Sequence, residues 1–145
     1  MCGFLGEMTD FPKTINEQDK LQFYERNNLL YHRGPDEEGY YFDEHVSLGF
    51  RRLSIIDLES GSQPASYDSE RYWIVFNGEI YNFLYLKSQL ADKGYTFSTS
   101  SEAEVIAAMF SHWHVNMFSY LPACLLFLFG IKKNKNCMEP EILLV

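Results

Sequence analysis

The chain begins Met1-Cys2-Gly3-Phe4-Leu5-Gly6, a small, apolar stretch that predicts a short buried strand with a thiol at its start. If Met1 is removed, Cys2 carries both a thiol and a free α-amine. The amine titrates near pH ~7.7 to 8.0 and the thiol near ~8.5, so the amine can act as base for its own nucleophile, directly or through a water. By position alone, a cysteine that merely occupies the second place is the commoner case. The rest of the sequence decides between these two interpretations.

A helix is predicted between this strand and a Gly-Pro break. Thr14 and Glu17 match a capping box that would start the helix. The stretch His32-Arg33-Gly34-Pro35-Asp36 ends it, because glycine and proline break the helical pattern. Short strands are expected next at 40–42, 46–50 and 53–58, and a loop at 60–64. The apolar face of the helix would carry Leu21, Tyr24, Leu29 and Leu30.

A strongly strand-like run, Tyr72-Trp73-Ile74-Val75-Phe76, halts at Asn77-Gly78, the dipeptide best suited to a tight turn with positive φ. An amphipathic helix then runs to about Gly94, which can adopt the left-handed C-terminal cap. Ser101 and Glu104 form a second capping box, which leads another helix. Strands and helices together predict an α+β chain.

The composition is that of one globular domain: 145 residues, 46% hydrophobic and 22% charged. A formal charge of −8 argues against a broad contact with nucleic acid or an anionic membrane, so we expect neither partner. Cysteines at positions 2, 124 and 137 are too few and too scattered for a disulfide framework, and no signal-peptide pattern opens the chain. The expected compartment is the cytoplasm.

The run from Val115 to Ile131 is almost uncharged and is apolar on every side. A transmembrane helix is one interpretation, but the run is short for a bilayer core and has Pro122 in its middle. We therefore expect no membrane span.

Polar residues next to predicted strands are candidates for a reactive site. The side-chain amide of Asn77 and the backbone N–H of Gly78 could point at one developing oxyanion, although a hairpin turn is the simpler explanation of this pair taken alone. Arg51-Arg52 are either surface charges or bidentate partners for a carboxylate. Glu79 and Glu102 could hold a substrate ammonium group.

Two other kinds of site are not expected. His112 and His114 lie close together and Cys124 lies apart, with no fourth ligand apparent, so we predict no metal site. No glycine-rich phosphate loop is present, so no ATP site is recognisable and we expect no cofactor in this chain.

Four motifs, in a particular order, make this sequence similar to a known family. They are MCGFLG at 1–6, HRGPD at 32–36, RRLSIID at 51–57 and NGEIYN at 77–82. Their order resembles that of the class II glutamine amidotransferase domain. Within that superfamily, the second and third motifs are similar to those of glutamine-hydrolysing asparagine synthetases.

The resemblance implies an N-terminal-nucleophile fold, an αββα sandwich in which the terminal cysteine attacks the side-chain amide of L-glutamine. Ammonia leaves, and water hydrolyses the thioester to glutamate. Cys2 would be the nucleophile with its own amine as base, and Asn77 and Gly78 would form the oxyanion hole. Arg52 would clamp the α-carboxylate of glutamine. The remaining pocket residues would be the backbone of Leu53, Ser54, Ile55 and Ile56, together with Glu79 at the amide or amine end and Glu102 at the ammonium group.

One residue departs from the family pattern. The family usually has aspartate where Glu102 stands, within a Ser-Asp-x-Glu pattern that this sequence writes as Ser101-Glu102-Ala103-Glu104. The extra methylene keeps the charge but moves it, which affects ammonium recognition. The resemblance also implies a synthetase domain, missing or separate, that would receive the ammonia and hold ATP and Mg.

The resemblance extends over residues 1–121, so we expect a partial glutamine amidotransferase domain there, an aberrant tail at 122–145 and a sandwich whose second half is missing. In the family, the next stretch resembles GMFAF, an IWDK turn and a strand ending in ARDPFG. Read two bases later, with permitted codons, residues 136–145 become LYGARDPFG. Some steps leave no freedom, since Met138 before Glu139 must yield glycine in that frame. The hypothesis is a frameshift near Leu121 or Pro122.

Two functional hypotheses stay open at this point. The first is an enzyme, the glutaminase domain of an asparagine synthetase, whose turnover depends on whether the truncated chain folds. The second is a non-catalytic remnant that at most binds glutamine.

The frameshift hypothesis predicts what the gene contains. Sequencing across the codons of Leu121 and Pro122 should show a shifted remnant of the family pattern downstream, because the codons of the tail still spell it in another frame. An uninterrupted frame with no such remnant would overturn the hypothesis.

Overall fold

The computed structural model describes residues 2–54, 61–134 and 137–141, and its fold is α+β, as the sequence predicts. The strands and helices follow the chain in this order: β1 (Gly3–Met8), α1 (Glu17–Asn28), the 3-10 turn η1 (Tyr31–Arg33), β2 (Glu37–Phe42), β3 (Val46–Arg52), β4 (Ala65–Tyr67), β5 (Tyr72–Ile80), α2 (Phe83–Ala91), α3 (Glu102–Trp113), the 3-10 turn η2 (His114–Tyr120), β6 (Ala123–Asn134) and β7 (Cys137–Glu141).

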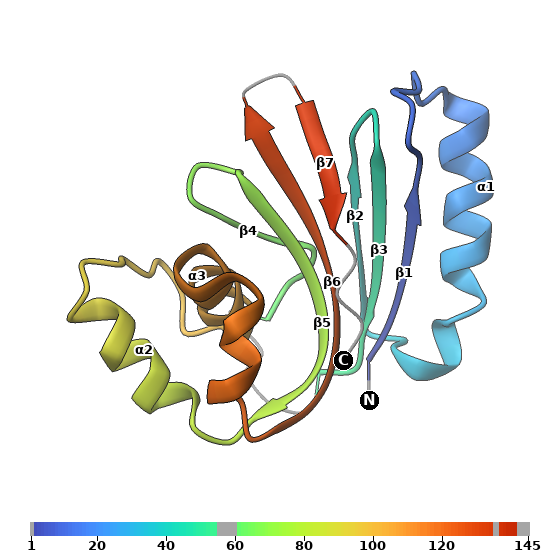
Figure 1. Cartoon of the computed structure of the whole chain (residues 1–145). Helices are drawn as coiled ribbons and strands as arrows, with labels where there is room; N and C mark the ends of the chain where they lie inside the picture. The colour runs from blue at the N-terminus through green and yellow to red at the C-terminus, as the bar shows by residue number, and fades with distance from the viewer. Residues whose placement is uncertain (1, 55–60, 135–136, 142–145) are drawn as a thin grey trace.

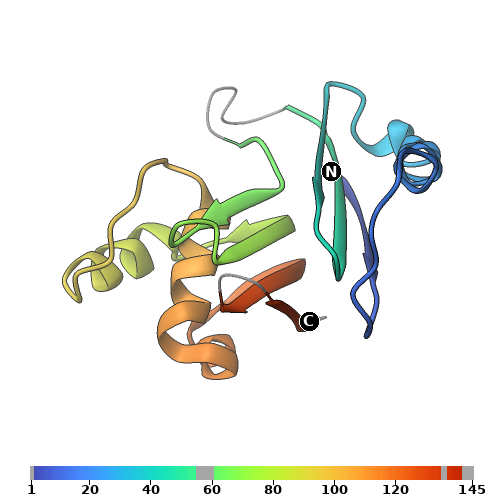
Figure 2. The ribbon, with the colours of Figure 1, turned by 90° about the horizontal axis from the view of Figure 1, so that it is seen from above.

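Two sheets lie face to face with helices on both outer sides (Figure 1). Helix α1 covers the outer face of the sheet formed by β1, β3 and β2, and helices α2 and α3 cover the outer face of the sheet formed by β4 to β7. Seen from above, the layers run helix, sheet, sheet, helices (Figure 2). The strands predicted at 1–6, 40–42, 46–50 and 72–76 are all confirmed as strands, whereas β4 was not predicted.

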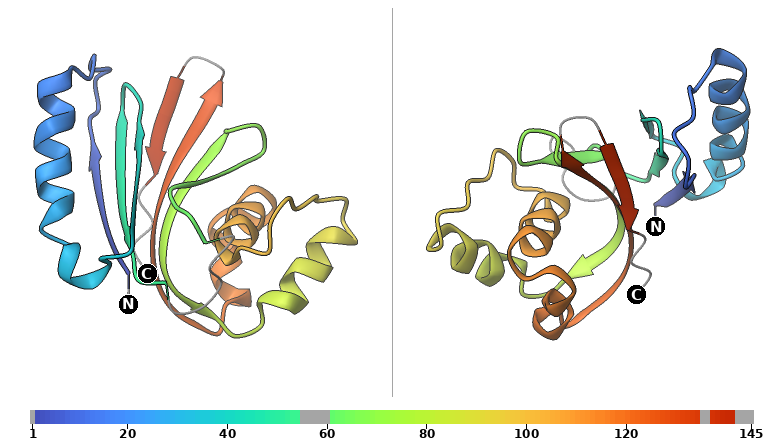
Figure 3. Two further views of the ribbon diagram at one scale, coloured as in Figure 1. Left: turned by 180° about the vertical axis from the view of Figure 1, so that it is seen from behind. Right: turned by 45° about the horizontal axis from the view of Figure 1, so that its top comes forward.

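Strand register brings the sequence motifs to one end of the sandwich. In the first sheet the order is β1-β3-β2, with Gly3 opposite Arg51 and Glu37 opposite Arg52. The end of β5 lies at the same end of the molecule as the N-terminus in both Figure 1 and the rear view of Figure 3. The start of β1, the end of β3 and the end of β5 therefore converge.

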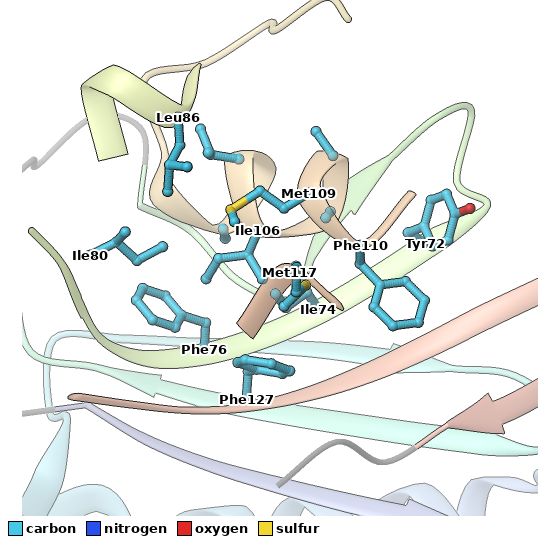
Figure 4. Close-up of a cluster of buried hydrophobic side chains, with 14 of the residues drawn as sticks. Tyr72, Ile74, Phe76, Ile80, Leu86, Ile106, Met109, Phe110, Met117 and Phe127 are labelled. Atoms are coloured by element: carbon cyan, nitrogen blue, oxygen red, sulfur yellow. The ribbon is translucent and has the colours of Figure 1, made fainter. Parts of the chain in front are cut away.

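Strand β5 contributes side chains to two hydrophobic clusters, because alternate residues of a strand point to opposite faces. Ile74 and Phe76 pack with α2 and α3 in the larger cluster (Figure 4). Val75 packs in the smaller cluster between the two sheets, beside Leu48 and Phe50 of β3. The sheet that contains β5 thus separates the helical core from the space between the two sheets.

Helix α1 begins two residues later than predicted and buries a different face against the sheet. Its capping box joins Asn16 and Asp19, with the Asp19 N–H 2.9 Å from the Asn16 side-chain oxygen, so the Thr14-Glu17 box is wrong. The predicted apolar face is wrong as well: Leu21 is 50% exposed, whereas Phe23 is 2% exposed.

The packing of α1 on β3 explains this face. Gly49 of β3 leaves room for the helix, since a Cβ there would lie 2.9 Å from both the Asn27 side-chain oxygen and the Phe23 ring. Asn27 is fully buried, and its amide nitrogen donates to the Tyr40 hydroxyl at 3.1 Å. A polar residue therefore occupies the centre of the buried face, which an apolar periodicity does not reveal.

The predicted turn at Asn77-Gly78 is wrong. Strand β5 continues through both residues to Ile80 and pairs with β6 along its whole length. The one positive glycine φ among the described residues is that of Gly94, at 91°, just after α2, where a left-handed cap is predicted. Tertiary pairing with a distant strand therefore overrides the local turn preference of Asn-Gly.

Helix α3 is capped by Ser101, whose hydroxyl accepts from the Ala103 N–H at 3.2 Å. Glu104 does not return to the cap as the predicted box requires, but accepts from the backbone and hydroxyl groups of Ser98 and Thr99 at 2.7 to 2.9 Å. Burial raises the pKa of Glu104, but these hydrogen bonds outweigh it and hold the pKa below the usual value. The segment before α3 is thereby fixed to the helix.

The apolar segment 115–131 forms most of η2 and of β6. Strand β6 pairs with β5, and β7 pairs with β6. No helix in the described ranges combines the length and apolarity that crossing a membrane requires. The strand predicted at 53–58 is absent at Leu53 and Ser54, and residues 55–58 lie outside the described part.

Phe23→Ala in α1 should lower the free energy of unfolding by about 3–5 kcal/mol, because it empties the contact between α1 and β3. Leu21→Ala on the exposed side should change it by about 0.5 kcal/mol or less. Urea unfolding of the two variants measures both. Equal losses would show that α1 does not pack through the Phe23 face.

Candidate active site

Cys2 lies half-buried at the start of β1, directly beside the residue that follows β3. The Leu53 N–H donates to the Cys2 sulfur at 3.4 Å, and the sulfur lies 3.9 Å from the Leu53 carbonyl oxygen. Cys2 also packs against the inter-sheet cluster that contains Val75. The thiol therefore lies between the two sheets, at the end where the motifs converge.

The HRGPD motif connects the first and third motifs. Arg33 donates from Nε to the Cys2 carbonyl at 3.2 Å. A side chain at Gly34 would overlap the Arg51-Arg52 backbone, so only glycine allows this approach. Asp36 donates from its backbone N–H to the Arg52 carbonyl at 3.0 Å and accepts from the Ser54 N–H at 2.7 Å. The motif thus fixes the backbone on both sides of Leu53.

Arg51 and Arg52 point to opposite faces of β3, as strand alternation requires. Arg51 faces α1, where it pairs with Glu38 at 2.6 Å and donates to Asn28 at 2.8 Å. Arg52 pairs with Glu37 at 2.9 Å. Their exposed fractions are 8% and 5%, so the interpretation as surface charges is wrong. Arg52 is the arginine on the side of Gly61 and the cavity described below.

One edge of β5 loses its partner strand before β5 ends. Strand β4 pairs with β5 only as far as Ala65 opposite Ile74. Beyond that point, the Gln63 side chain takes the place of a strand: its oxygen accepts from the Phe76 N–H at 2.6 Å, and its nitrogen donates to the Phe76 carbonyl at 3.1 Å. Further along, the Ile80 N–H donates to Glu102 at 3.2 Å.

Gly78 lies between these two positions. Backbone N–H groups of alternate residues leave a strand by the same edge, so the Gly78 N–H points the same way as those of Phe76 and Ile80. Within the described part of the chain, no side chain accepts a hydrogen bond from it. The middle donor on this edge is therefore available to a ligand.

A cavity of about 440 Å³ opens beside this edge. Gly61 links it to β3, since a side chain at Gly61 would overlap the Arg52 guanidinium. The size suits a small-molecule ligand. The lining residues are Gly61, Gln63, Phe76, Gly78, Glu79, Phe83, Ser100, Ser101, Glu102 and Ala103.

The carboxylates of this cavity lie close enough to influence each other. Burial raises the pKa of Glu102, and the negative charge of Glu79 raises it further, while the hydrogen bond from Ile80 opposes both. The cavity therefore favours a cation near Glu102, because a positive group would relieve both effects.

The predicted site residues fall into two groups. Leu53 contacts Cys2, with Arg52 and Ser54 on either side of it in the chain, whereas Gly78, Glu79 and Glu102 line the cavity. Strand alternation places Asn77 on the same face of β5 as Val75, which packs in the cluster beside Cys2. The lining of the cavity, as far as the chain is described, does not include Cys2 itself. The predicted pocket residues Ile55 and Ile56 lie outside the described residues.

Sequence reasoning missed Glu37, Gly61 and Gln63. The Ser62 hydroxyl donates to Glu37 at 2.6 Å, and this bond lowers the pKa of Glu37, as does the Arg52 pair, against the effect of burial. A loop of small and polar residues gives no local sign of such contacts. Only the register of β4 and β5, which puts Gln63 opposite Phe76, could have identified it.

Comparisons with known proteins match most of the chain to one kind of domain. The sequence model of the glutamine amidotransferase domain matches residues 1–138, beyond the boundary predicted at 121. Asparagine synthetase (glutamine-hydrolyzing) 1 of Bacillus subtilis strain 168 is 47% identical over 136 residues, which is 94% of this chain and 21% of that protein. Asparagine synthetase B (glutamine-hydrolyzing) of Escherichia coli K12 is 40% identical over 110 residues, 76% of this chain and 19% of that protein.

The chain thus spans about a fifth of the length of these relatives. The match to the domain covers all four motifs, from the thiol at position 2 to the edge of β5. The chain belongs to the glutamine amidotransferase domain family.

Proposed function

We propose that this chain hydrolyses L-glutamine to glutamate and ammonia, as the glutaminase domain of an asparagine synthetase. In this proposal, the layers described above are an N-terminal-nucleophile αββα sandwich. The observation that carries the proposal is the position of the Gly78 N–H on the edge of β5. It lies between the N–H groups of Phe76 and Ile80, which already donate to the side chains of Gln63 and Glu102.

The proposed reaction begins once Met1 is removed. The α-amine of Cys2 accepts the thiol proton, and the sulfur attacks the carbonyl carbon of the glutamine side chain. The resulting oxyanion is stabilised by the Gly78 N–H and the Asn77 side-chain amide. The ammonium of Cys2 returns the proton to the leaving nitrogen, so that ammonia departs and a thioester remains. Water then cleaves the thioester, which releases glutamate and restores the thiol.

The two ends of glutamine have complementary partners in the proposed complex. Arg52 binds the α-carboxylate, and the pair with Glu37 fixes its guanidinium for this role. The backbone of residues 53–56 lines the pocket. Glu102 binds the α-ammonium, and Glu79 contacts the amide or amine end; the proximity of these two carboxylates to Gly78 in one cavity supports this.

The ammonia would serve the ATP-dependent conversion of aspartate to asparagine by a synthetase domain. The names of these relatives support this assignment, and the match covers about a fifth of the length of each. ATP and Mg would belong to that domain. We place the reaction in the cytoplasm, where ATP and glutamine are both available.

The division at residue 121, with a frameshifted tail after it, stays a prediction. Whatever the coding origin of the tail, β6 occupies the edge of β5 opposite the cavity, where Gly78 pairs with Leu125. The backbone of this segment therefore borders the proposed oxyanion strand.

The second candidate is a remnant that binds glutamine without turnover. The separation of Cys2 from the cavity lining favours it, because a nucleophile must reach the bound amide. Covalent labelling distinguishes the two candidates. A glutamine-like diazoketone should alkylate Cys2 in the enzyme, and glutamine should block the labelling; binding seen by calorimetry without labelling would indicate the remnant.

Cys2→Ala should lower glutamate release from the Met1-processed protein by at least about 10³-fold, because the covalent step is lost. Calorimetry should still detect glutamine binding to the variant, since the Arg52 and Glu102 contacts remain. A Cys2→Ala protein that releases glutamate as fast as its parent would contradict the proposed mechanism.

Protonation of Glu102 should reduce the activity at acidic pH, which gives the pH profile an acid limb. Since burial favours its neutral form, its carboxyl ionises only above the usual value of 4.5, and the ammonium of glutamine is bound only by the ionised form. As pH falls through this raised pKa, the KM for glutamine should rise.

Glu102→Gln should remove that limb and raise the KM about tenfold to hundredfold at neutral pH, as expected for the loss of one charge-assisted hydrogen bond. The variant should be no less stable than the parent at neutral pH, because it removes a half-buried charge and keeps an acceptor for the Ile80 N–H. An unchanged acid limb in Glu102→Gln would assign the limb to another group.

A further inference from the structure

The Gly61–Gln63 turn, which the sequence presents as a plain loop, contacts both halves of the site. Gly61 lies against the Arg52 guanidinium, and Ser62 donates to Glu37, the partner of Arg52. Gln63 binds Phe76 on β5. One short turn thus touches the proposed carboxylate clamp on β3 and the proposed oxyanion strand.

Gln63 replaces the backbone of a missing strand residue. The pairing of Ala65 with Ile74 would put residue 63 opposite Phe76 if β4 continued. Both polar atoms of the Gln63 side chain bind Phe76 instead, one accepting at 2.6 Å and one donating at 3.1 Å, in the pattern of a peptide group.

The backbone of Gln63 is held from the opposite side. A side chain at Gly39 of β2 would overlap the Gln63 carbonyl, so these two backbones are in close contact. Gln63 therefore lies between the first sheet and the edge of β5. Phe76 is fixed by Gln63 on one edge and pairs with Phe127 of β6 on the other.

We propose that Gln63 is a positioning residue for the oxyanion hole: by holding the Phe76 peptide, it fixes the direction of the Gly78 N–H two residues further on. The inference rests on the proposed glutaminase function. A donor stabilises an oxyanion only when it lies about 2.7–3.1 Å from the developing charge, so a small rotation of β5 costs rate. In the described part of the chain, the hydrogen bonds of the Gln63 side chain go to Phe76 and not to Arg52 or Glu102, so we expect its effect to fall on the transition state more than on ground-state binding.

Gln63→Glu is the sharpest variant, because it keeps the shape and the acceptor for the Phe76 N–H but puts a second acceptor against the Phe76 carbonyl. It should lower kcat about tenfold to hundredfold, below the ~10²- to 10³-fold cost of deleting an oxyanion donor outright. The KM should stay within about threefold. Ser62→Ala is the matched control from the same turn: it loosens Glu37 and Arg52, so its effect should fall on the KM.

A pH profile separates positioning from a merely structural role. In Gln63→Glu, a protonated carboxyl can again donate to the Phe76 carbonyl, so the ratio of variant to parent kcat should rise as pH falls. Gln63→Ala has no such group, and its ratio should not change with pH. If the alanine variant does not fold, Gln63→Glu alone carries the test, after a thermal unfolding check.

An effect of Gln63→Glu on the KM alone, or a kcat ratio that does not rise at low pH, would overturn the proposal. Failure of the glutaminase function itself gives a different result, since the parent would then release no more glutamate than Cys2→Ala does. Glutamine affinity measured by calorimetry in the Cys2→Ala background completes the comparison, because adding Gln63→Glu there should leave it unchanged.

Discussion

The site depends on the early departure of β4 from the edge of β5. Buried backbone donors need acceptors, and a strand that loses its neighbour exposes a row of N–H groups on one edge. Here the row is Phe76, Gly78 and Ile80, and side chains from a loop and a helix satisfy the first and the last. The middle N–H keeps its capacity to bind, next to a cavity that the missing strand would have filled.

The other half of the site is built by close backbone approaches within and beside the first sheet. Gly34 lets the HRGPD segment approach the end of β3, and Gly61 lets the following turn approach Arg52. Cys2 joins this group through the Leu53 N–H. The space of a side chain is occupied by the Arg51-Arg52 backbone at Gly34 and by the Arg52 guanidinium at Gly61. Closely packed backbone segments therefore hold Cys2 and Arg52 in position.

Sequence reasoning found strands β1, β2 and β3, the first part of β5, the mixed fold class and the motif residues, since alternation and helical spacing are local properties. It failed where a distant segment decides the structure. Asn77-Gly78 has the composition of a turn, yet β6 draws both residues into a strand. The buried face of α1 depends on Gly49, a residue of another element that no helical pattern contains. Gln63 escaped notice for the same reason, because its partner lies on β5 and the intervening residues give no signal.

The two neighbouring arginines of β3 face two neighbouring glutamates of β2, Glu37 opposite Arg52 and Glu38 opposite Arg51. Because adjacent residues point to opposite faces, each arginine meets its own glutamate on its own side of the sheet. A slip of the hairpin by one residue would leave one of the two glutamates opposite an uncharged residue. The register of this hairpin therefore depends on charge as well as on hydrophobicity, and loss of either arginine would leave the glutamate on the same face of the sheet without its ion pair.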